Sequence, residues 1–448
     1  MASDQVLPRQ SAGFPASAAP VAQQASWRLT RQFWVVAHRW AGLTLALFLA
    51  VAGFTGIFLA WIDELEVAAA PELQLAAPPY AGAKPLSTLE LRRQVLARYP
   101  GARIDYVPMA VEEGHSLRLY LTWVHGDASA TPAPPHDWDD LFIDPYTGQE
   151  LGRRQWGNIG QGMKNLMPFV YRLHYSLALG TYGTLVFGLA ALVWVVDCFI
   201  GFYLTLPVVT KGPVRQSWLA RWKPSWSLRW PKAGLTAGRQ FFTYKLNFDL
   251  HRAGGLWVWP LLLVFAVSSL SLNLPQVYGP LMQTMGGVDS SALYESATLR
   301  KPRYQPKITF DAAAERGRAL AGLATQRAGL QMADWGESYL WHIPMTGTYL
   351  YGFTTSADIG HHGAGSFVAF DSDSGGLRAV QFPTGQHGAN TFTTWVEAIH
   401  TAHVGGLAWR VGTSLMGAVV TMLCITGVVI WMKKCQGRGN RQRKTKSH

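Results

Sequence analysis

An almost entirely apolar run at positions 33–62 constrains the fold of this chain more than any other stretch. It is long enough to cross the roughly 30 Å hydrocarbon core of a bilayer as a helix. The run contains the letters HRWAGL at positions 38–43. A charged side chain inside such a helix costs about 2.5–3.5 kcal/mol on insertion scales, so His38 and Arg39 are expected to find partners inside a helical bundle.

The same pattern recurs later in the chain. The letters HRAGGL at positions 251–256 open a second apolar run that ends near residue 274. A shift of 226 residues aligns positions 171–207 with 397–433 and matches His174 with His400, together with two glycines and a cysteine. A tandem repeat is therefore predicted, in which each half contributes two membrane helices.

Four such runs indicate a multi-pass membrane protein. The net charge of +12 does not indicate nucleic-acid binding, because the basic residues cluster beside the apolar runs. Residues 208–244 and 433–448 each hold seven Lys/Arg, whereas residues 63–166 and 275–391 hold more acids than bases. The positive-inside rule then predicts a bacterial inner-membrane protein with both termini in the cytoplasm.

The expected fold class is a membrane α-helical protein with four transmembrane helices, arranged as a tandem pseudo-twofold repeat, and two small α+β periplasmic domains. The expected segments are a disordered cytoplasmic tail (1–30), a first membrane helix (31–62), a first periplasmic domain (63–166), a second membrane helix (168–207), a basic cytoplasmic loop (208–244), a third membrane helix (245–274), a second periplasmic domain (275–391), a fourth membrane helix (392–433) and a basic cytoplasmic tail (434–448).

The two outer segments show similar patterns. The first has a helix at 87–98, which starts with a capping-box sequence, a hairpin of strands within 102–109 and 116–124, and a strand at 141–144. The second has a helix at 311–323 and strands at 338–343, 349–355 and 366–371. Both segments end a strand with Asp-x-x-(Thr/Ser)-Gly and contain no cysteine, so both are expected to fold without disulfides.

Each of the four predicted membrane helices carries a histidine near one end. The predicted orientation puts His38 and His251 near the cytoplasmic face and His174 and His400 near the outer face. A pseudo-twofold axis along the membrane normal pairs His38 with His251 and His174 with His400, at two levels roughly 30–36 Å apart for a rise of 1.5 Å per residue. One metal or cofactor bridging two helices would satisfy each pair.

Haem fits two histidines better than zinc does, because haem needs two axial ligands whereas zinc sites take three or four protein ligands. Gly42 and Gly255 leave room for a flat ring, and Arg39 and Arg252 can pair with its propionates. The chain has no Cys-x-x-Cys-His sequence, so two non-covalently bound b-type haems are predicted.

His403 lies three residues after His400 and offers a second candidate for the outer ligand. The repeat alignment favours His400, and His403 is then a propionate or substrate contact. Arg172 and Arg410 are candidate counter-charges or lipid-interface residues. The pair His361 and His362 lies in a Gly-rich loop, where it could contact a metal chelate or only solvent. None of the histidines of the two outer segments has the spacing of metal ligands: His115, His125, His136, His342, His361, His362 and His387.

Four tryptophans recur at intervals of four within the basic loop, at positions 218, 222, 226 and 230. Such a segment suits the surface of an anionic lipid membrane. It also suits the docking of an electron-donating partner, and the sequence leaves both readings open.

The HRxxGL openings, the Leu-His and Ile-His openings of the alternate helices and the outer segments that end in Asp-x-x-(Thr/Ser)-Gly resemble the PepSY-associated transmembrane family over about residues 30–434. This resemblance implies PepSY-like outer domains and two b-type haems in an inner-membrane ferric-siderophore reductase. By position it implies the ligands His38, His174, His251 and His400. The chain contains no nucleotide-binding pattern, so a separate cytoplasmic or quinol electron donor is expected.

Two other functions remain open at this point. One is a non-redox, membrane-anchored pair of PepSY modules that binds or regulates a partner, with its histidines satisfied by hydrogen bonds. The other is a metal transporter. An absorption spectrum of the purified protein distinguishes the cytochrome from both, because a b-type haem has a Soret band.

Overall fold

The structure is a computed structural model of the whole chain. It describes residues 30–123, 137–208, 217–229, 243–288, 298–333, 338–360 and 365–446. The predicted disordered tail therefore lies outside the described residues, apart from Thr30, as do parts of the predicted basic loop.

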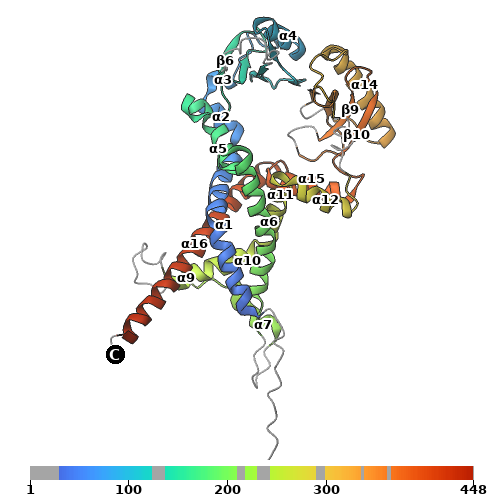
Figure 1. The fold of residues 1–448 in the computed structure, drawn as a ribbon. Helices are drawn as coiled ribbons and strands as arrows, with labels where there is room; N and C mark the ends of the chain where they lie inside the picture. The colour runs from blue at the N-terminus through green and yellow to red at the C-terminus, as the bar shows by residue number, and fades with distance from the viewer. Residues whose placement is uncertain are drawn as a thin grey trace, which may run out of the picture.

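A bundle of long helices forms one end of the molecule, and two sheet-bearing lobes form the other (Figure 1). Three described helices are apolar enough and long enough to cross a membrane: α1 (Arg31–Leu59), α6 (Gly180–Thr205) and residues Gly406–Gly437 of α16 (Gly406–Lys446). α1 packs along α16 and α6, and α6 packs along α11 (Trp259–Asn273). The first residues of α1 and the last residues of α16 lie at the end of the bundle farthest from the sheets.

The predicted third membrane helix, 245–274, is broken. It consists of α9 (Tyr244–Asp249), a π-helical turn η4 (Leu250–Gly254), α10 (Gly255–Trp257) and α11, with a bend of 74° before Trp259. Pro260 stands in the first turn of α11 and has no N–H to continue a helix from α10. If this bent pair is one span, the described chain has four membrane spans.

The predicted helices 168–207 and 392–433 are each divided in two. α5 (Leu166–Ser176) ends at Leu177, which has a φ of 50° and is followed by the start of α6 three residues later. α15 (Gly388–His400) is followed by a turn with a φ of 59° at Ala402 before α16 begins. A left-handed residue ends a helix by redirecting its backbone, so His174 and His400 lie on separate short helices.

The helices α1 and α16 touch through glycine. A Cβ on Gly417 would lie 2.5 Å from the carbonyl oxygen of Gly53, and a Cβ on Gly53 would lie 2.8 Å from the carbonyl oxygen of Gly417. Such backbone contact is typical of membrane helices. The hydrophobic effect does not drive these helices together in lipid, and small residues let them approach closely enough for van der Waals packing.

The first outer segment contains a helix where the sequence predicted one, α4 (Thr88–Arg98), although the side chain of its N-cap Ser87 makes no capping hydrogen bond. Two short helices precede it, α2 (Ile62–Ala69) and α3 (Pro71–Gln74). Its sheet has the order β3-β5-β6. The strands of this segment are β1 (Ala102–Arg103), β2 (Tyr106–Pro108), β3 (Leu117–Tyr120), β4 (Thr122–Trp123), β5 (Asp140–Ile143) and β6 (Glu150–Arg154).

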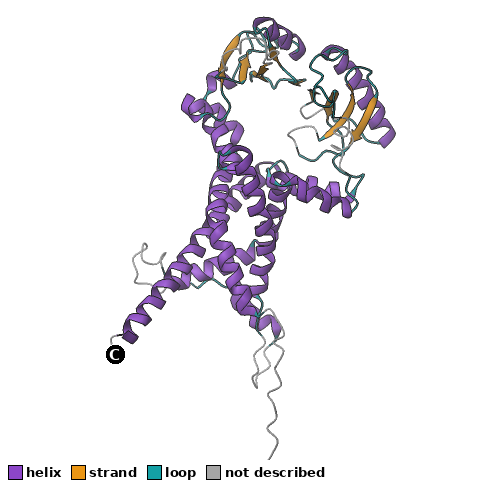
Figure 2. Cartoon of the chain, in the orientation of Figure 1, coloured by secondary structure: helices purple, strands orange, loops and turns teal. Residues whose placement is uncertain are grey.

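The second outer segment contains α12 (Pro275–Thr284) and α14 (Phe310–Ala328), which covers the predicted helix 311–323 (Figure 2). Its strands are β7 (Tyr339–Ile343), β8 (Thr348–Phe353), β9 (Ser366–Asp371) and β10 (Leu377–Gln381). The strand predicted at 366–371 has its exact bounds in β9, whereas β10 and β6 were not predicted.

The two outer segments share one sheet, of order β10-β9-β8-β7-β2. The predicted hairpin forms only between β1 and β4, because β2 pairs instead with β7 of the second segment. Val107 and Leu340 are directly opposite in this pairing and are both fully buried in a core that contains residues of both segments. Pairing with β7 satisfies the backbone groups on one side of this three-residue strand, which then forms an edge of the shared sheet.

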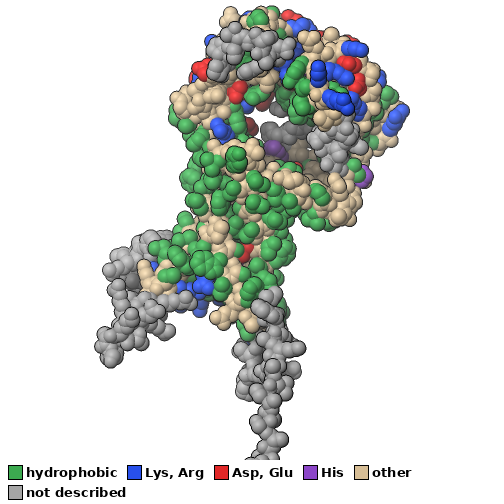
Figure 3. All heavy atoms as spheres, viewed as in Figure 1, with side chains coloured by type: hydrophobic (Ala, Val, Ile, Leu, Met, Phe, Trp, Pro, Cys, Tyr) green, Lys and Arg blue, Asp and Glu red, His purple; other side chains and the backbone are tan. Residues whose placement is uncertain are grey.

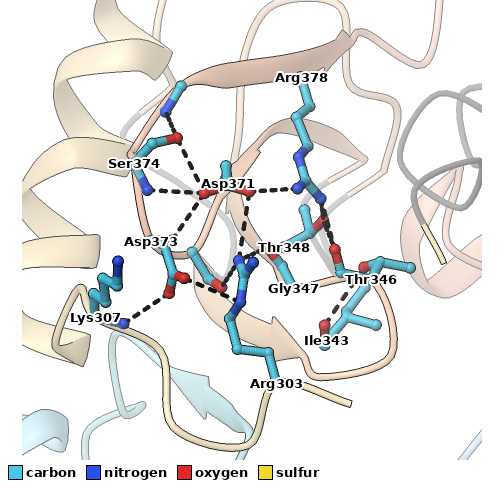
Figure 4. Close-up of polar contacts among 12 residues, drawn as sticks. Arg303, Lys307, Ile343, Thr346, Gly347, Thr348, Asp371, Asp373, Ser374 and Arg378 are labelled. Atoms are coloured by element: carbon cyan, nitrogen blue, oxygen red, sulfur yellow. Dashed lines mark hydrogen bonds and ion pairs between the residues drawn. The ribbon is translucent and has the colours of Figure 1, made fainter. Parts of the chain in front are cut away.

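The predicted Asp-x-x-(Thr/Ser)-Gly turns form in both segments. Asp144 accepts hydrogen bonds from the amides of Tyr146 and Thr147, and Asp371 accepts them from Asp373 and Ser374 (Figure 4). Burial alone would raise the pKa of Asp371, but the amide and hydroxyl donors of this turn and the Arg378 guanidinium hold that pKa well below its usual value.

Candidate functional site

We call the end of the bundle farthest from the sheets its tail end. The rings of the two histidines nearest to this end face each other. His38 lies on α1 and His251 on the π-helical turn η4, and their ring centroids are 6.1 Å apart with an angle of 58° between the planes. A π turn adds one residue to a helical turn and occurs frequently at functional sites.

The two histidines nearer the sheets form an equivalent pair. His174 lies in the last turn of α5 and His400 ends α15, and their ring centroids are also 6.1 Å apart, with an angle of 83°. Phe265 of α11 lies against His400 with a centroid separation of 4.9 Å. The structure thus brings together the same two pairs that the repeat alignment pointed to.

Every one of these four rings is held through Nδ1. In the pair near the tail, His38 Nδ1 is 2.9 Å from Asp197 Oδ1, and His251 Nδ1 is 3.0 Å from the carbonyl oxygen of Leu423 and 3.2 Å from Thr426 Oγ1. A carboxylate and a carbonyl oxygen only accept, so Nδ1 donates in both rings. The remaining nitrogen, Nε2, is then the unprotonated one that can bind a metal ion.

In the outer pair both acceptors are hydroxyls. His174 Nδ1 is 3.1 Å from Thr55 Oγ1, and His400 Nδ1 is 2.7 Å from Ser268 Oγ. Each hydroxyl donates its own hydrogen to a backbone carbonyl one turn earlier, at 2.6 Å from Thr55 to Val51 and 2.9 Å from Ser268 to Val264. The hydroxyl oxygens are therefore free to accept from Nδ1, which again leaves Nε2 for a ligand bond.

Three of the rings lie close to a glycine of a neighbouring helix. A Cβ on Gly201, Gly427 or Gly56 would lie 3.4 Å, 3.3 Å or 3.2 Å from Cε1 of His38, His251 or His174, respectively. These glycines lie on α6, α16 and α1, each on the helix that also supplies the Nδ1 acceptor. A side chain larger than that of alanine at any of these positions would press on the Cε1 edge of the ring.

The spacing of both pairs fits a shared metal ion. Two imidazoles on opposite sides of one ion, with metal–nitrogen bonds of about 2.0–2.1 Å, have ring centroids roughly 6.4–6.6 Å apart, since each centroid lies about 1.2 Å behind its nitrogen. The observed separation is 6.1 Å in both pairs. Two ligands per ion match an iron that takes its other four bonds from a macrocycle.

A cavity of about 690 Å³ surrounds the pair near the tail. Its volume lies within the range of about 300–1,000 Å³ typical of cofactor sites. Gly42 and Gly255 line it, and a Cβ on Gly42 would meet nothing within 4 Å. Open space therefore lies beside Gly42, whereas a Cβ on Gly255 would touch the Leu423 side chain at 3.7 Å, and apolar side chains form most of the cavity wall.

Arg39 and Arg252 also line this cavity. The Nε atom of each is buried and has no hydrogen-bond partner within the described ranges. Arg252 additionally binds Asp249, which Arg229 holds from the other side, so its charge is already partly balanced. An unpartnered guanidinium N–H at a cavity wall is suited to the carboxylate of a ligand, as the propionates of haem provide.

His403 is placed differently from His400. It is exposed in the turn after α15, where its Nδ1 is 3.1 Å from Thr401 Oγ1. Gly360 of the second outer segment packs onto the backbone of His403, since a Cβ on Gly360 would lie 2.2 Å from the carbonyl oxygen of His403. The geometry therefore favours His400 as the partner of His174 and puts His403 at the surface of the turn between α15 and α16.

The two histidine levels are closer together than the sequence estimate of 30–36 Å. Thr55, which contacts His174, is 17 residues beyond His38 on the same helix, which corresponds to roughly 25 Å at 1.5 Å per residue. The estimate was too long because it placed the outer pair at the end of the first helix. The division of α5 from α6 instead lets His174 reach down to Thr55.

Aromatic rings extend from the cavity towards the surface. Phe202 and Trp259 line the cavity with centroids 4.7 Å apart, Trp222 is 6.1 Å from Phe202, and Trp218 is 4.9 Å from Trp222. Trp218 is 46% exposed and begins α7 (Trp218–Trp222), so the predicted tryptophan series connects to the wall of the cavity through Phe202.

The remaining candidates lie elsewhere. Arg172 donates to the carbonyl oxygen of Gly157, and Arg410 forms an ion pair with Glu64. His342 is buried, with Nδ1 3.9 Å from Asp105, whereas His115 and His387 lie on the outer segments. Within the described ranges no three His, Cys, Asp or Glu side chains gather as a metal site. The histidines outside these ranges are His125, His136, His361, His362 and His448.

Sequence reasoning missed the residues that hold the rings, above all Asp197. Its side chain is 10% exposed, and it stands within the apolar helix α6. An acidic residue inside a membrane helix is rare enough to mark a functional position, and that signal was present in the sequence. Thr55 and Ser268 gave no such signal, because hydroxyls are common in membrane helices.

Comparison with known proteins identifies the family. A search of curated proteins found no match. The family model of the PepSY-associated TM region matches residues 35–434, a stretch that includes all four paired histidines. The chain is therefore a membrane protein that belongs to the PepSY-associated transmembrane family.

Proposed function

We propose that this protein binds two b-type haems and carries electrons across a bacterial inner membrane to a ferric chelate, such as a ferric siderophore, outside. The observation that carries the proposal is the 6.1 Å separation of the ring centroids in both histidine pairs. Haem, when bound, supplies one-electron redox chemistry at each level.

The residues of the chain have distinct tasks in this proposal. His38 and His251 bind one iron and His174 and His400 the other, through Nε2. The acceptors at Nδ1 fix the tautomer and orientation of each ring. Arg39 and Arg252 bind the propionates of the inner group, and the apolar wall of the cavity excludes water from it.

The two ends of the bundle suit the two partners. The basic, tryptophan-rich segment, which reaches the inner cavity through Phe202, suits a cytoplasmic or quinol donor. The positive-inside rule leads us to expect both termini on that same, cytoplasmic side. A hollow separates the two outer lobes from the bundle (Figure 3), and the outer pair lies on α5 and α15, at the end of the bundle next to the lobes (Figure 1), so we expect a ferric chelate to approach there. The chelated Fe(III) gains one electron, the donor loses it, and the weaker binding of Fe(II) releases the metal.

Two measurements test this function. The purified protein is expected to show a Soret band and two haems per chain, and the dithionite-reduced protein is expected to pass electrons to ferrioxamine, with the Fe(II) trapped by a coloured chelator. His174→Ala should lose one haem and most of the ferric reduction. Protein without a Soret band would refute the proposal and support a non-redox PepSY module or a metal transporter, and so would a His174→Ala variant with full haem content and activity.

A further inference from the structure

The two halves of the bundle differ at one position that touches a candidate iron ligand. The shift of 226 residues aligns α6 with α16 and places Asp197 opposite Leu423. In the first half the Asp197 carboxylate lies 2.9 Å from His38 Nδ1. In the second half the side chain is aliphatic, and His251 Nδ1 turns to the backbone carbonyl of Leu423 instead.

Asp197 is placed where a carboxylate is costly. It lies inside an apolar helix, and its side chain is 10% exposed. A charged residue at such a depth costs about 2.5–3.5 kcal/mol on insertion scales. Its hydrogen-bond partner in the described part of the chain is His38, so the carboxylate serves that ring rather than the packing of the helices.

The four rings therefore donate to acceptors of different strength. His38 donates to a carboxylate, His251 to a carbonyl, and His174 and His400 to hydroxyls. A charged acceptor binds the Nδ1 proton about twice as strongly as a neutral one. Stronger binding of that proton makes Nε2 a more basic ligand, which stabilises the ferric over the ferrous form of the bound iron.

We propose that Asp197 is a positioning residue that makes the inner haem harder to reduce than the outer one, so that electrons pass downhill from the inner to the outer level. The inference rests on the proposed function. It assigns the direction of transfer to one side chain that the second half of the repeat lacks.

Spectroelectrochemical titration of the full-length protein tests this inference without an activity assay. The wild type is expected to show two potentials, and Asp197→Asn is expected to raise only the lower one. The expected change is tenfold or more in the equilibrium constant of the inner haem, which equals about 59 mV for one electron. Asp197→Glu, which keeps the charge, should stay closer to the wild-type potential.

Assignment of the potentials uses a protein with one haem. In a His400→Ala background, which should retain the inner haem alone, the shift caused by Asp197→Asn should persist. Ser268→Ala is the matched control, since it removes a neutral acceptor from the outer pair and should leave the inner potential unchanged. If Asp197→Asn loses the inner haem, Asp197→Ser gives the same comparison with a hydroxyl acceptor like those of the outer pair.

Unchanged potentials in an Asp197 variant that still holds both haems would overturn the inference, and so would an equal shift of both potentials. Absence of haem from the wild-type protein would instead overturn the proposed function. The two failures are therefore distinguishable in the same preparation.

Discussion

Gly201 offers the most direct test of the proposed inner site, because His38 lies against it. A Cβ at this position would lie 3.4 Å from Cε1 and 3.8 Å from Nδ1 of His38. These are ordinary contact distances, so Gly201→Ala should fit with shifts of a few tenths of an ångström. Valine adds γ carbons in two of the three staggered positions around Cβ, which leaves its rotamer little freedom to avoid the ring.

The size of the effect follows from contact distances. A γ carbon that extends about 1.5 Å beyond Cβ towards the ring would come within roughly 2 Å of it, whereas carbon atoms rest at about 3.5–4.0 Å. The ring must then move by about 1.5 Å, which is most of a metal–nitrogen bond of roughly 2 Å. Gly201→Val should therefore break the bond from His38, at a packing cost of about 1–3 kcal/mol.

The assay is haem content. The pyridine haemochrome absorbance of the purified protein should give two haems per chain for Gly201→Ala and one for Gly201→Val. Gly437→Val is the matched control, since this glycine also lies on a long helix and a Cβ on it would meet nothing within 4 Å. Two haems per chain in Gly201→Val, with an unchanged spectrum, would refute the placement of His38 as an inner ligand.

Three further predictions concern the outer site and the outer lobes. His400→Ala should lose one haem per chain by absorbance whereas His403→Ala should keep both, and the reverse result would move the ligand to His403. Arg154→Met should destabilise the first outer segment by about 1.5–3 kcal/mol in denaturant unfolding, because the buried Asp140 carboxylate loses Arg154 and keeps its second arginine partner, Arg118; a second change, Asp140→Asn, should recover part of the loss, and additive effects would contradict this. Asp371 has a lower pKa in the folded than in the unfolded state, so its contribution to stability is present above its ordinary pKa of 3.8 and is lost as pH falls below that value; the difference in Tm between wild type and Asp371→Asn should shrink over that range, and a constant difference would contradict the assignment.

Much of the fold could be predicted because local patterns decide it. The apolar runs predict helices long enough for a membrane, and α1 and α6 lie within the predicted helices at 31–62 and 168–207. Alternation and turn residues predicted β9 with its exact bounds and the Asp371 turn that follows it. These features depend on residues close together in the chain, where pattern and propensity act directly.

The helix breaks and the shared sheet were decided by the tertiary structure. The left-handed residue Leu177 ends α5 early, although leucine is a good helix former, because the short helix must pack against α1. β2 pairs with β7 across more than two hundred residues of sequence, since the buried Val107 completes a core made by both segments. Local pattern carries no information about such distant partners.

For the candidate site, the sequence by itself determined which residues could be ligands: the repeat aligns His38 with His251 and His174 with His400. The tertiary structure decided how they are held. It brought Asp197 to His38 and Thr55 to His174, put His403 outside, and shortened the distance between the levels to roughly 25 Å. The physical reason is that a repeat specifies equivalent positions, whereas the contacts at each position depend on how the helices pack.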